Sequence, residues 1–327
     1  MRIGLLLPHF SDFSNRDRLI GFAPRIEELG FDSVWVRDNL SYTGGHAFDP
    51  HGNTFVDPFI TLAAVAGRTS RVGLGTAVVI PFRHPLVTAQ LFGSLNWVAP
   101  GRVEVGLGPG DPTKPFELVG IDFADRIELC KETADVLRVV AREREASYEG
   151  KITKFTDAKL NPAPPEDLMI WYGGASNASV RRVLEYCDGI LPGRCPFRRY
   201  DQVLEKLRSG AAEIGKIVHA GTIPHISIAS TYEEAVRRIE PSMPGLFEYL
   251  SGRWRSPYAT FEDVRGAVMV GTPASIVEQL DEFRERGVDL VVLDARLDMP
   301  LFEEVVEMIG ESVLPTFAEP HPVATGP

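Results

Sequence analysis

The fold is decided by a stretch in which two apolar runs enclose an amphipathic one, VGLGTAVVIPFRHPLVTAQLFGSLNWVAPGRVEVGLG at residues 72–108. Residues 72–80 and 102–108 are short and lack polar alternation, as expected of strands that are covered on both faces. Residues 85–98 between them have the length of a helix. A strand, a helix and a second strand in this order predict one unit of a parallel sheet.

The same alternation continues on both sides of this stretch. We expect eight strands, at residues 3–7, 33–36, 72–80, 102–108, 168–172, 188–192, 224–230 and 288–294. Helices are expected at 16–30, 57–69, 85–98, 122–145, 176–186, 200–215, 273–286 and 301–312. A doubly wound sheet would have about six strands and a glycine loop after the first, which LLLPHF lacks. The pattern therefore predicts an α/β fold, a (β/α)8 TIM barrel that forms a single domain over residues 1–315.

Two insertions and a tail interrupt the regular pattern. Alternating residues around Glu149-Gly150, within 146–168, predict a small hairpin before the fifth strand. Residues 232–266 form a longer insertion between the seventh and eighth strands, rich in aromatic residues and arginine. Long barrel insertions are usually lids or interfaces, so we expect this one to cover the mouth of the active site. Residues 316–327 are expected to be a C-terminal tail.

Composition excludes several classes of protein. The formal net charge of −11 argues against a nucleic acid or an anionic membrane surface as a partner. No apolar run approaches the roughly 20 residues that span a bilayer. The three cysteines, Cys130, Cys187 and Cys195, have neither metal-site spacing nor disulfide-scaffold density, which predicts a cytoplasmic protein without a cysteine metal site.

The active site of a (β/α)8 barrel lies at the C-terminal ends of its strands. This rule selects the residues that follow seven of the eight predicted strands: His9, Arg37-Asp38-Asn39, 81–84, 109–111, 173–176, 193–195 and Arg296. Among them, YGGASNAS at 172–179 places two glycines between a strand and a helix, where backbone amides can approach an anion. The same residues could also form a plain tight turn with Ser176 as the helix N-cap.

Six blocks taken together resemble a known family: FDSVWVRDNL (31–40), RVGLGTAVVIPFRHPLVTAQ (71–90), GRVEVGLGPG (101–110), the predicted helix that contains Arg126, LMIWYGGASNASVRRVLEYCDGI (168–190) and GTPASIVEQLDEFRERGVDLVVL (271–293). Their order and spacing resemble the luciferase-like monooxygenase superfamily. The resemblance implies an oxidoreductase that acts on a small organic substrate with reduced FMN, or alternatively one that transfers hydride with coenzyme F420. It also implies a homodimer and a separate flavin or F420 reductase.

The resemblance further implies which residues hold the cofactor. Its phosphate would lie at Gly173, Gly174, Ala175 and Ser176, next to Tyr172. A non-prolyl cis peptide bond at Ala77–Val78, after Thr76, would face the ring, together with Asp38 and the close backbone of Gly106 and Gly108. Arg194 and the nearby Arg198 and Arg199, which follow the sixth predicted strand, could anchor a cofactor phosphate or a longer anionic tail.

Catalytic residues are less well defined by the sequence. Where the family typically has an acid followed by histidine, this chain has Asp38 and Asn39, and asparagine cannot shuttle a proton near neutral pH. Asp38 could equally cap a turn. We prefer His9 as the proton relay, with Asp111 as a second candidate, although a lone histidine is more often structural. His84 and His46 are further possibilities, and His84 could simply help to start the helix at residue 85.

Two other hypotheses come from different classes. A barrel without a redox cofactor could bind a sugar phosphate, or act as a lyase, with the same glycine turn. The missing histidine also fits an inactive partner subunit. Flavin or deazaflavin binding distinguishes the first hypothesis from ours, and turnover distinguishes the second.

Overall fold

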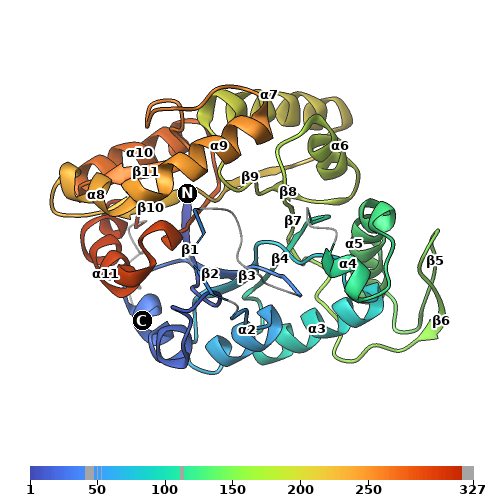
Figure 1. Cartoon of the computed structure of the whole chain (residues 1–327). Helices are drawn as coiled ribbons and strands as arrows, with labels where there is room; N and C mark the ends of the chain where they lie inside the picture. Colours follow the sequence, from blue (N-terminus) through green and yellow to red (C-terminus); the bar gives the residue numbers. More distant parts are fainter. Residues whose placement is uncertain (41–47, 50, 53, 111–113, 319–327) are drawn as a thin grey trace, which may run out of the picture.

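The protein is a closed barrel of eight parallel strands surrounded by helices (Figure 1). The computed structural model describes residues 1–40, 48, 49, 51, 52, 54–110 and 114–318. The barrel strands are β1 (Arg2–Leu6), β2 (Ser33–Val36), β3 (Gly73–Thr76), β4 (Val103–Leu107), β7 (Ile170–Tyr172), β8 (Gly189–Ile190), β9 (His219–Thr222) and β12 (Leu290–Leu293). Around the barrel their order is β1-β12-β9-β8-β7-β4-β3-β2, which confirms the predicted fold class.

The helices outside the strands follow the predicted amphipathic segments closely. They are η1 (Asp17–Gly21), α1 (Ala23–Glu28), α2 (Pro58–Ala66), α3 (Pro85–Val98), α5 (Arg126–Arg142), α6 (Asn177–Tyr186), α7 (Phe197–Ile214), α10 (Pro273–Glu285) and α11 (Phe302–Ser312). Short helices are α4 (Lys114–Leu118), η2 (Phe123–Asp125), η3 (Glu240–Ser242), η4 (Arg296–Leu301) and η5 (Leu314–Thr316). Local signals explain several starts, since α2 and α3 have proline in the first turn and a side-chain cap from Asp57 or His84.

The prediction of the seventh barrel strand was wrong. That strand is β9 (His219–Thr222), which lies between β8 and β12, whereas the predicted run at 224–230 contains β10 (His225–Ile228). β10 instead pairs with β11 (Val268–Gly271) in a separate two-stranded parallel sheet. The segment HAGT has little apolar character, yet Gly221 leaves room for Leu191, because a Cβ there would lie 2.8 Å from Leu191 Cδ1. Strand pairing within the closed barrel therefore overrides local propensity here.

The insertion between the seventh and eighth barrel strands accordingly begins earlier than residue 232. It contains β10, α8 (Tyr232–Ile239), η3, α9 (Met243–Trp254) and β11. Figure 1 shows these elements together beside α10, on one side of the barrel. Its helices and β11 form a second apolar cluster that includes Leu246, Leu250 and Val270 and that reaches Phe48 and Leu297.

Large side chains fill the barrel itself. Trp35, Trp171, Leu191, Leu290 and Val292 belong to the cluster in its interior. Glycine on the neighbouring strands makes room for the two tryptophans, since a Cβ at position 75 would lie 2.3 Å from Trp35 and one at position 189 would lie 2.7 Å from Trp171. The barrel is thus a packed core, and ligands must bind at its ends.

The predicted hairpin before the fifth barrel strand is confirmed. β5 (Ala146–Glu149) and β6 (Lys154–Ala158) are antiparallel and project from the barrel beside α5 (Figure 1). Buried Glu132 accepts the N–H groups of Ile152 (2.9 Å) and Thr153 (2.8 Å) and so fixes the hairpin turn to α5.

At the C-terminus, Phe317 packs against the core, and residues 319–327 of the predicted tail lie outside the described residues. In the part of the chain that the structure describes, none of the helices combines the length and the apolar character needed to cross a membrane.

Candidate functional site

Two groups of residues meet at the C-terminal ends of the strands, on different sides of the barrel mouth. The first, here called the glycine shelf, is formed by the ends of β3, β4 and β7 and contains Thr76, Ala77, Val78, Gly106, Gly108 and Gly173. The second, here called the arginine cluster, follows β2, β8, β9 and β12 and contains Arg37, Asp49, Arg194, His225, Asp294 and Arg296.

The glycine shelf is held together by close packing around Val78. A Cβ at Gly108 would lie 2.4 Å from Val78 Cγ2, and one at Gly173 would lie 2.9 Å from Val78 Cγ1. At Gly106 a Cβ would lie 2.0 Å from the carbonyl oxygen of Thr76. Only glycine lets these three backbones approach each other so closely. The structure therefore brings together all the shelf residues that the sequence singled out.

Hydrogen bonds fix the start of the shelf. The Gly106 N–H donates to Thr76 Oγ1 (2.9 Å), and that hydroxyl donates to the Gly106 carbonyl (3.1 Å), so Thr76 ties β3 to β4. The next peptide bond, Ala77–Val78, is cis, as the resemblance implies. Val79 then pairs with Leu107, because its N–H donates to Gly106 O (2.7 Å).

The glycine turn at residues 173–176 lies beside this shelf and leads into α6. The Gly173 N–H donates to the Leu107 carbonyl oxygen (2.8 Å), and Ser176 forms a reciprocal capping box with Ser179. The N–H groups of Gly174, Ala175, Asn177 and Ala178 have no acceptor among the described residues. Ser176 and Asn177 are exposed, so an anion can reach the N-terminus of α6.

The arginines that follow the sixth predicted strand lie in different surroundings, and Arg199 is the one at this turn. Arg199 contacts the turn, since its Nε and Nη2 donate to the Ala175 carbonyl at 3.2 and 2.9 Å. Arg194 instead donates to Tyr249 Oη (3.3 Å) and lies over the rings of Phe48 and Tyr249. The Tyr172 side chain is buried in the layer between strands and helices, where its hydroxyl accepts from Arg182 (2.9 Å), so only its backbone borders the turn.

Asp38 links the second strand end to the segment after the shelf. Its carboxylate accepts the Ile80 N–H (3.1 Å) and a bidentate pair of bonds from Arg83, at 2.6 and 3.2 Å. Arg83 also binds Asp57, the N-cap of α2, at 3.0 Å. Burial raises the pKa of Asp38, whereas Arg83 and the Ile80 amide act in the opposite direction. This arrangement positions residues 77–83 rather than exposing a free carboxylate.

His9 is fully buried and both of its ring nitrogens are engaged. Nδ1 lies 2.9 Å from Val56 O and donates to it, which leaves Nε2 to accept the Arg37 N–H (2.8 Å). Burial lowers the pKa of His9 to about 3, and the charges of Arg37 and Arg296 act in the same direction. A neutral imidazole that is hydrogen-bonded through both nitrogens is well suited to hold two backbone segments in place.

The remaining candidates fall into two groups. Asn39 is half-buried directly after Asp38, and His84 caps α3 by accepting the Leu86 N–H (3.2 Å), which is the structural role considered for it. Asp111 and His46 lie outside the described residues.

Burial raises the pKa of the Cys195 thiol to about 12, so Cys195 is a poor nucleophile. Within the described ranges, no group of three or more potential ligands is arranged to hold a metal ion.

The arginine cluster was only partly visible in the sequence. Arg296 binds Asp294 (2.6 Å) and Asp49 (3.0 Å), and His225 Nδ1 lies 3.4 Å from Asp294 Oδ2. Burial alone would raise the pKa of Asp294, but Arg296 and His225 lower it overall. Arg37 and Arg296 could be selected from the sequence because they follow predicted strands. His225 was missed because residues 224–230 were assigned to a barrel strand.

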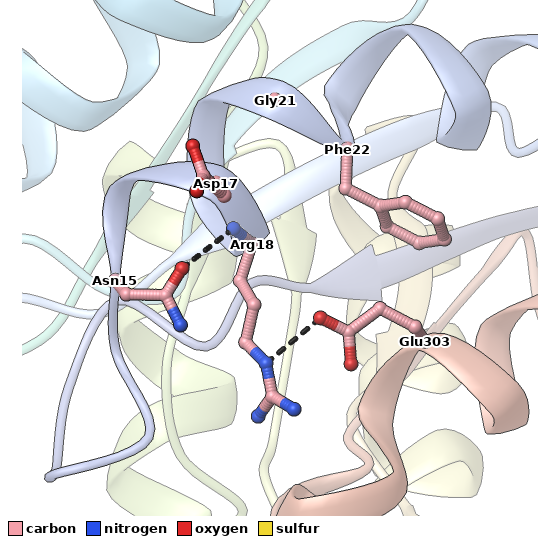
Figure 2. A pocket seen from close by; sticks show the side chains of 6 residues that line it. All are labelled: Asn15, Asp17, Arg18, Gly21, Phe22 and Glu303. Atoms are coloured by element: carbon pink, nitrogen blue, oxygen red, sulfur yellow. Dashed lines mark hydrogen bonds and ion pairs between the residues drawn. The ribbon is translucent and has the colours of Figure 1, made fainter.

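An open depression of about 570 Å³ lies elsewhere, on the outside of the barrel between η1 and α11 (Figure 2). Asn15, Asp17, Arg18 and Glu303 line it, and Arg18 Nε pairs with Glu303 at 2.8 Å. It contains none of the residues predicted for the site, and its arginine is already neutralised. The candidate site residues at the barrel mouth are therefore separate from this depression.

Comparison with known proteins agrees with this geometry. The 5,10-methylenetetrahydromethanopterin reductase of Methanopyrus kandleri is 24% identical over 90% of this chain and 93% of its own. The F420-dependent glucose-6-phosphate dehydrogenase of Microbacterium testaceum is 30% identical over 61% of this chain and 60% of its own.

Among solved structures, the oxygenating component of the Pseudomonas putida 3,6-diketocamphane monooxygenase, in complex with FMN, has a TM-score of 0.74 and 19% identity. The match covers 98% of this chain and 99% of that one. The family model of the luciferase-like monooxygenases matches residues 1–290, nearly the whole barrel. On this evidence, together with the closed barrel and the converging strand ends, the chain belongs to the luciferase-like monooxygenase family.

Proposed function

We propose that the protein is an oxidoreductase that binds coenzyme F420 at the glycine shelf, with the cofactor phosphate at residues 173–176, and acts on a small organic substrate. The relative named as an F420-dependent dehydrogenase supports F420. Reduced FMN is the second candidate, favoured by the likeness to a monooxygenase described in complex with FMN. When bound, F420 supplies hydride transfer without oxygen, whereas reduced FMN supplies oxygen chemistry.

The residues present fit such a cofactor. Glycine at positions 106, 108 and 173 lets residues 76–78 pack directly against the ends of β4 and β7. We propose that the planar ring of the cofactor lies against the surface that results. The observation that carries the proposal is the accessible start of α6, where several N–H groups lack an acceptor among the described residues. Unsatisfied amides and the helix dipole together favour a phosphate. Arg199 adds a positive charge beside Ala175.

The other predicted residues receive positioning roles in this proposal. Asp38 holds the segment after the shelf through Ile80 and Arg83. His9 joins the backbone of Arg37 to that of Val56 through its two ring nitrogens, so neither nitrogen is available to substrate. Asn39 is proposed to make hydrogen bonds without proton transfer, and Asp111 remains the candidate acid. Membership of an oxidoreductase family favours this reading over a cofactor-free lyase or an inactive partner subunit.

The insertion is proposed to be a lid. Tyr249 of α9 reaches the barrel mouth, where it contacts Arg194 and stacks edge-on against Phe48. A cover at this place would exclude water from the reacting groups. A homodimer, a separate F420 or flavin reductase and a cytoplasmic location complete the proposal. The location is supported by the three cysteines, all of which are buried and free of disulfides.

The test uses a negative charge at the start of α6. Ala178 is the second residue of this helix, and Ala178→Asp should weaken cofactor binding about tenfold by repelling the phosphate. The isosteric control Ala178→Asn should bind like the wild type. Fluorescence titrations with F420 and with FMN, performed separately, measure both affinities and identify the cofactor.

Folding does not confound this comparison, because an acid in the first turn of a helix interacts favourably with its dipole. The melting temperature of Ala178→Asp should therefore not fall. Equal affinity of the aspartate and asparagine variants for the cofactor would refute a phosphate site at residues 173–176. Failure of the wild type to bind either cofactor would refute the proposed function itself.

A further inference from the structure

The arginine cluster contains more positive than negative charge. Arg37, Arg194 and Arg296 face the carboxylates Asp49 and Asp294, and among the described residues these five dominate the mutual electrostatic interactions at the mouth. His225 does not add charge, because its burial lowers the pKa of the ring. Three guanidinium groups against two carboxylates leave one cation without an ionic partner within this group.

Arg296 is the main ionic partner of both carboxylates. Its guanidinium binds Asp294 at 2.6 Å and Asp49 at 3.0 Å, and the side chains of all three residues are at most 3% exposed. This pairing satisfies a buried arginine. It leaves Arg37 and Arg194 without a close ion pair to either of these two carboxylates.

Arg37 and Arg194 have donors that no described residue accepts. Nη1 of Arg37 and Nε of Arg194 are buried atoms without a hydrogen-bond partner in the described part of the chain. Arg37 as a whole residue is half-buried, as is Arg194, so both lie near the surface of the mouth and not deep in the core. Burial and the neighbouring arginines lower the pKa of Arg37 to about 10, which reflects the cost of an unpaired cation at this place.

Aromatic rings hold these guanidinium groups in position. Arg37 lies 4.7 Å above the Phe10 ring, and Arg194 lies 5.1 Å from the ring centre of Tyr249. A stacked guanidinium keeps its edge free for hydrogen bonds in the plane, which is the geometry that binds carboxylate and phosphate oxygens. The cluster is thus built as a receptor for an oxyanion that this chain does not itself provide among its described residues.

We infer that the substrate carries an anionic oxygen group, a carboxylate or a phosphate, which Arg37 and Arg194 bind. This inference rests on the proposed function, because it places the substrate between the arginine cluster and the cofactor at the glycine shelf. The two sites lie on different strand ends of one mouth, with Arg37 after β2 and Arg194 after β8, whereas the shelf is formed by β3, β4 and β7. An anion at the cluster would orient the rest of the substrate across the barrel axis.

The experiment measures the effect of simple anions on thermal unfolding without cofactor. Malonate represents the carboxylates and inorganic phosphate represents the phosphates, with chloride at matched ionic strength as the control. Both oxyanions should raise the melting temperature of the wild type more than chloride does. Arg37→Met and Arg194→Met should each weaken this stabilisation, with an affinity about tenfold lower. Arg37→Lys should retain part of it.

Two comparisons keep the outcomes distinct. The Ala178→Asp variant blocks the α6 site but should keep the effect of malonate, so anion binding at the glycine turn can be separated from binding at the cluster. Cofactor titration of Arg37→Met should give the wild-type affinity.

Unchanged anion stabilisation in Arg37→Met and Arg194→Met would overturn the inference. So would a loss of cofactor affinity in those variants, since the cluster would then serve the cofactor tail. A wild type that binds cofactor but responds to neither oxyanion would overturn the inference and leave the proposed function intact. In the Ala178→Asp background, where the α6 site is blocked, the larger of the malonate and phosphate responses identifies which oxyanion the substrate carries.

Discussion

His9 illustrates how a buried polar residue shapes the barrel mouth. It lies at the end of β1, and its two hydrogen bonds join the chain at Val56 to the backbone of Arg37. Phe10 and Phe55 pack edge-on around the ring. Because both nitrogens are used by the backbone, the residue stabilises the site while it stays neutral.

This predicts a specific dependence of stability on pH. The pKa of His9 is about 3 in the folded state, below its ordinary value near 6.5, so below pH 6.5 the unfolded chain binds the proton more tightly. Arg37 and Arg296 oppose the charged ring, while Asp57 favours it. Stability should therefore fall as pH drops from 6.5 towards 3, by about 1.4 kcal/mol per pH unit from this residue.

Urea unfolding of the wild type and His9→Gln between pH 7.5 and 4.5 checks this prediction. The glutamine variant should show a shallower decline below pH 6.5 and no change of slope above it. Phe55→Leu, which alters packing on the ring without removing a titrating group, is the control and should lower stability by a similar amount at each pH. Parallel curves for wild type and His9→Gln would contradict the assignment.

At the scale of elements, the glycine shelf depends on contacts between three strand ends. Gly108 of the β4 end and Gly173 of the β7 end both face the side chain of Val78, while Gly106 faces the backbone of Thr76. These contacts differ in kind. A side chain can be shortened to relieve a clash, whereas a backbone carbonyl cannot.

A double-mutant cycle exploits this difference. Gly108→Ala should lower the free energy of unfolding by about 1–3 kcal/mol, because its Cβ would lie 2.4 Å from Val78 Cγ2. Adding Val78→Ala should recover part of that loss, so the two effects should not be additive. Chemical denaturation measures all four proteins of the cycle.

Gly106→Ala provides the matched control. Its Cβ would meet Thr76 O at 2.0 Å, so Val78→Ala should bring little recovery in this background. Equal recovery in both backgrounds, or strict additivity in the Gly108 cycle, would show that Val78 does not determine the shelf.

At the scale of the whole molecule, the two strands of the insertion join it to the apolar core of the barrel. Ile226 and Ile228 of β10 and Met269 of β11 belong to the same cluster as the strands and helices of the barrel. The outer helices present apolar residues to solvent elsewhere, on α2 and α3, where Ile60 is 67% and Trp97 is 74% exposed. Together these adjacent helices carry four exposed apolar side chains, at Ile60, Val87, Trp97 and Val98. Single exposed apolar residues are ordinary, whereas a contiguous group of them is typical of a surface that another chain covers.

We therefore expect the proposed homodimer to use the α2–α3 face. Trp97→Asp should shift the protein towards monomer, since it would bury a charge in the interface. Light scattering coupled to size-exclusion chromatography, over a range of protein concentrations, measures the mass. Ile217→Asp, at a position 84% exposed after α7, is the control and should leave the mass unchanged. A monomeric wild type would contradict the proposed dimer.

Much of the architecture could be predicted from local patterns. Helix α3 has its predicted bounds, β2 has its predicted residues, and the hairpin before β7 lies where the alternation around Glu149 indicates. The shelf glycines and the turn at residues 173–176 were also found from sequence, with the help of the family resemblance. Periodicity, glycine and proline act over a few residues, so the chain carries these signals locally.

The tertiary structure alone decided which strand closes the barrel and what faces the glycine shelf. HAGT is a barrel strand only because β8 and β12 flank it, and this placement moves His225 out of the barrel wall and into the arginine cluster. Arg37, Asp49, Arg194 and Arg296 are distant in the chain and meet only when the barrel closes. Their excess of positive charge is a property of distances between strand ends, and no local pattern of residues encodes it.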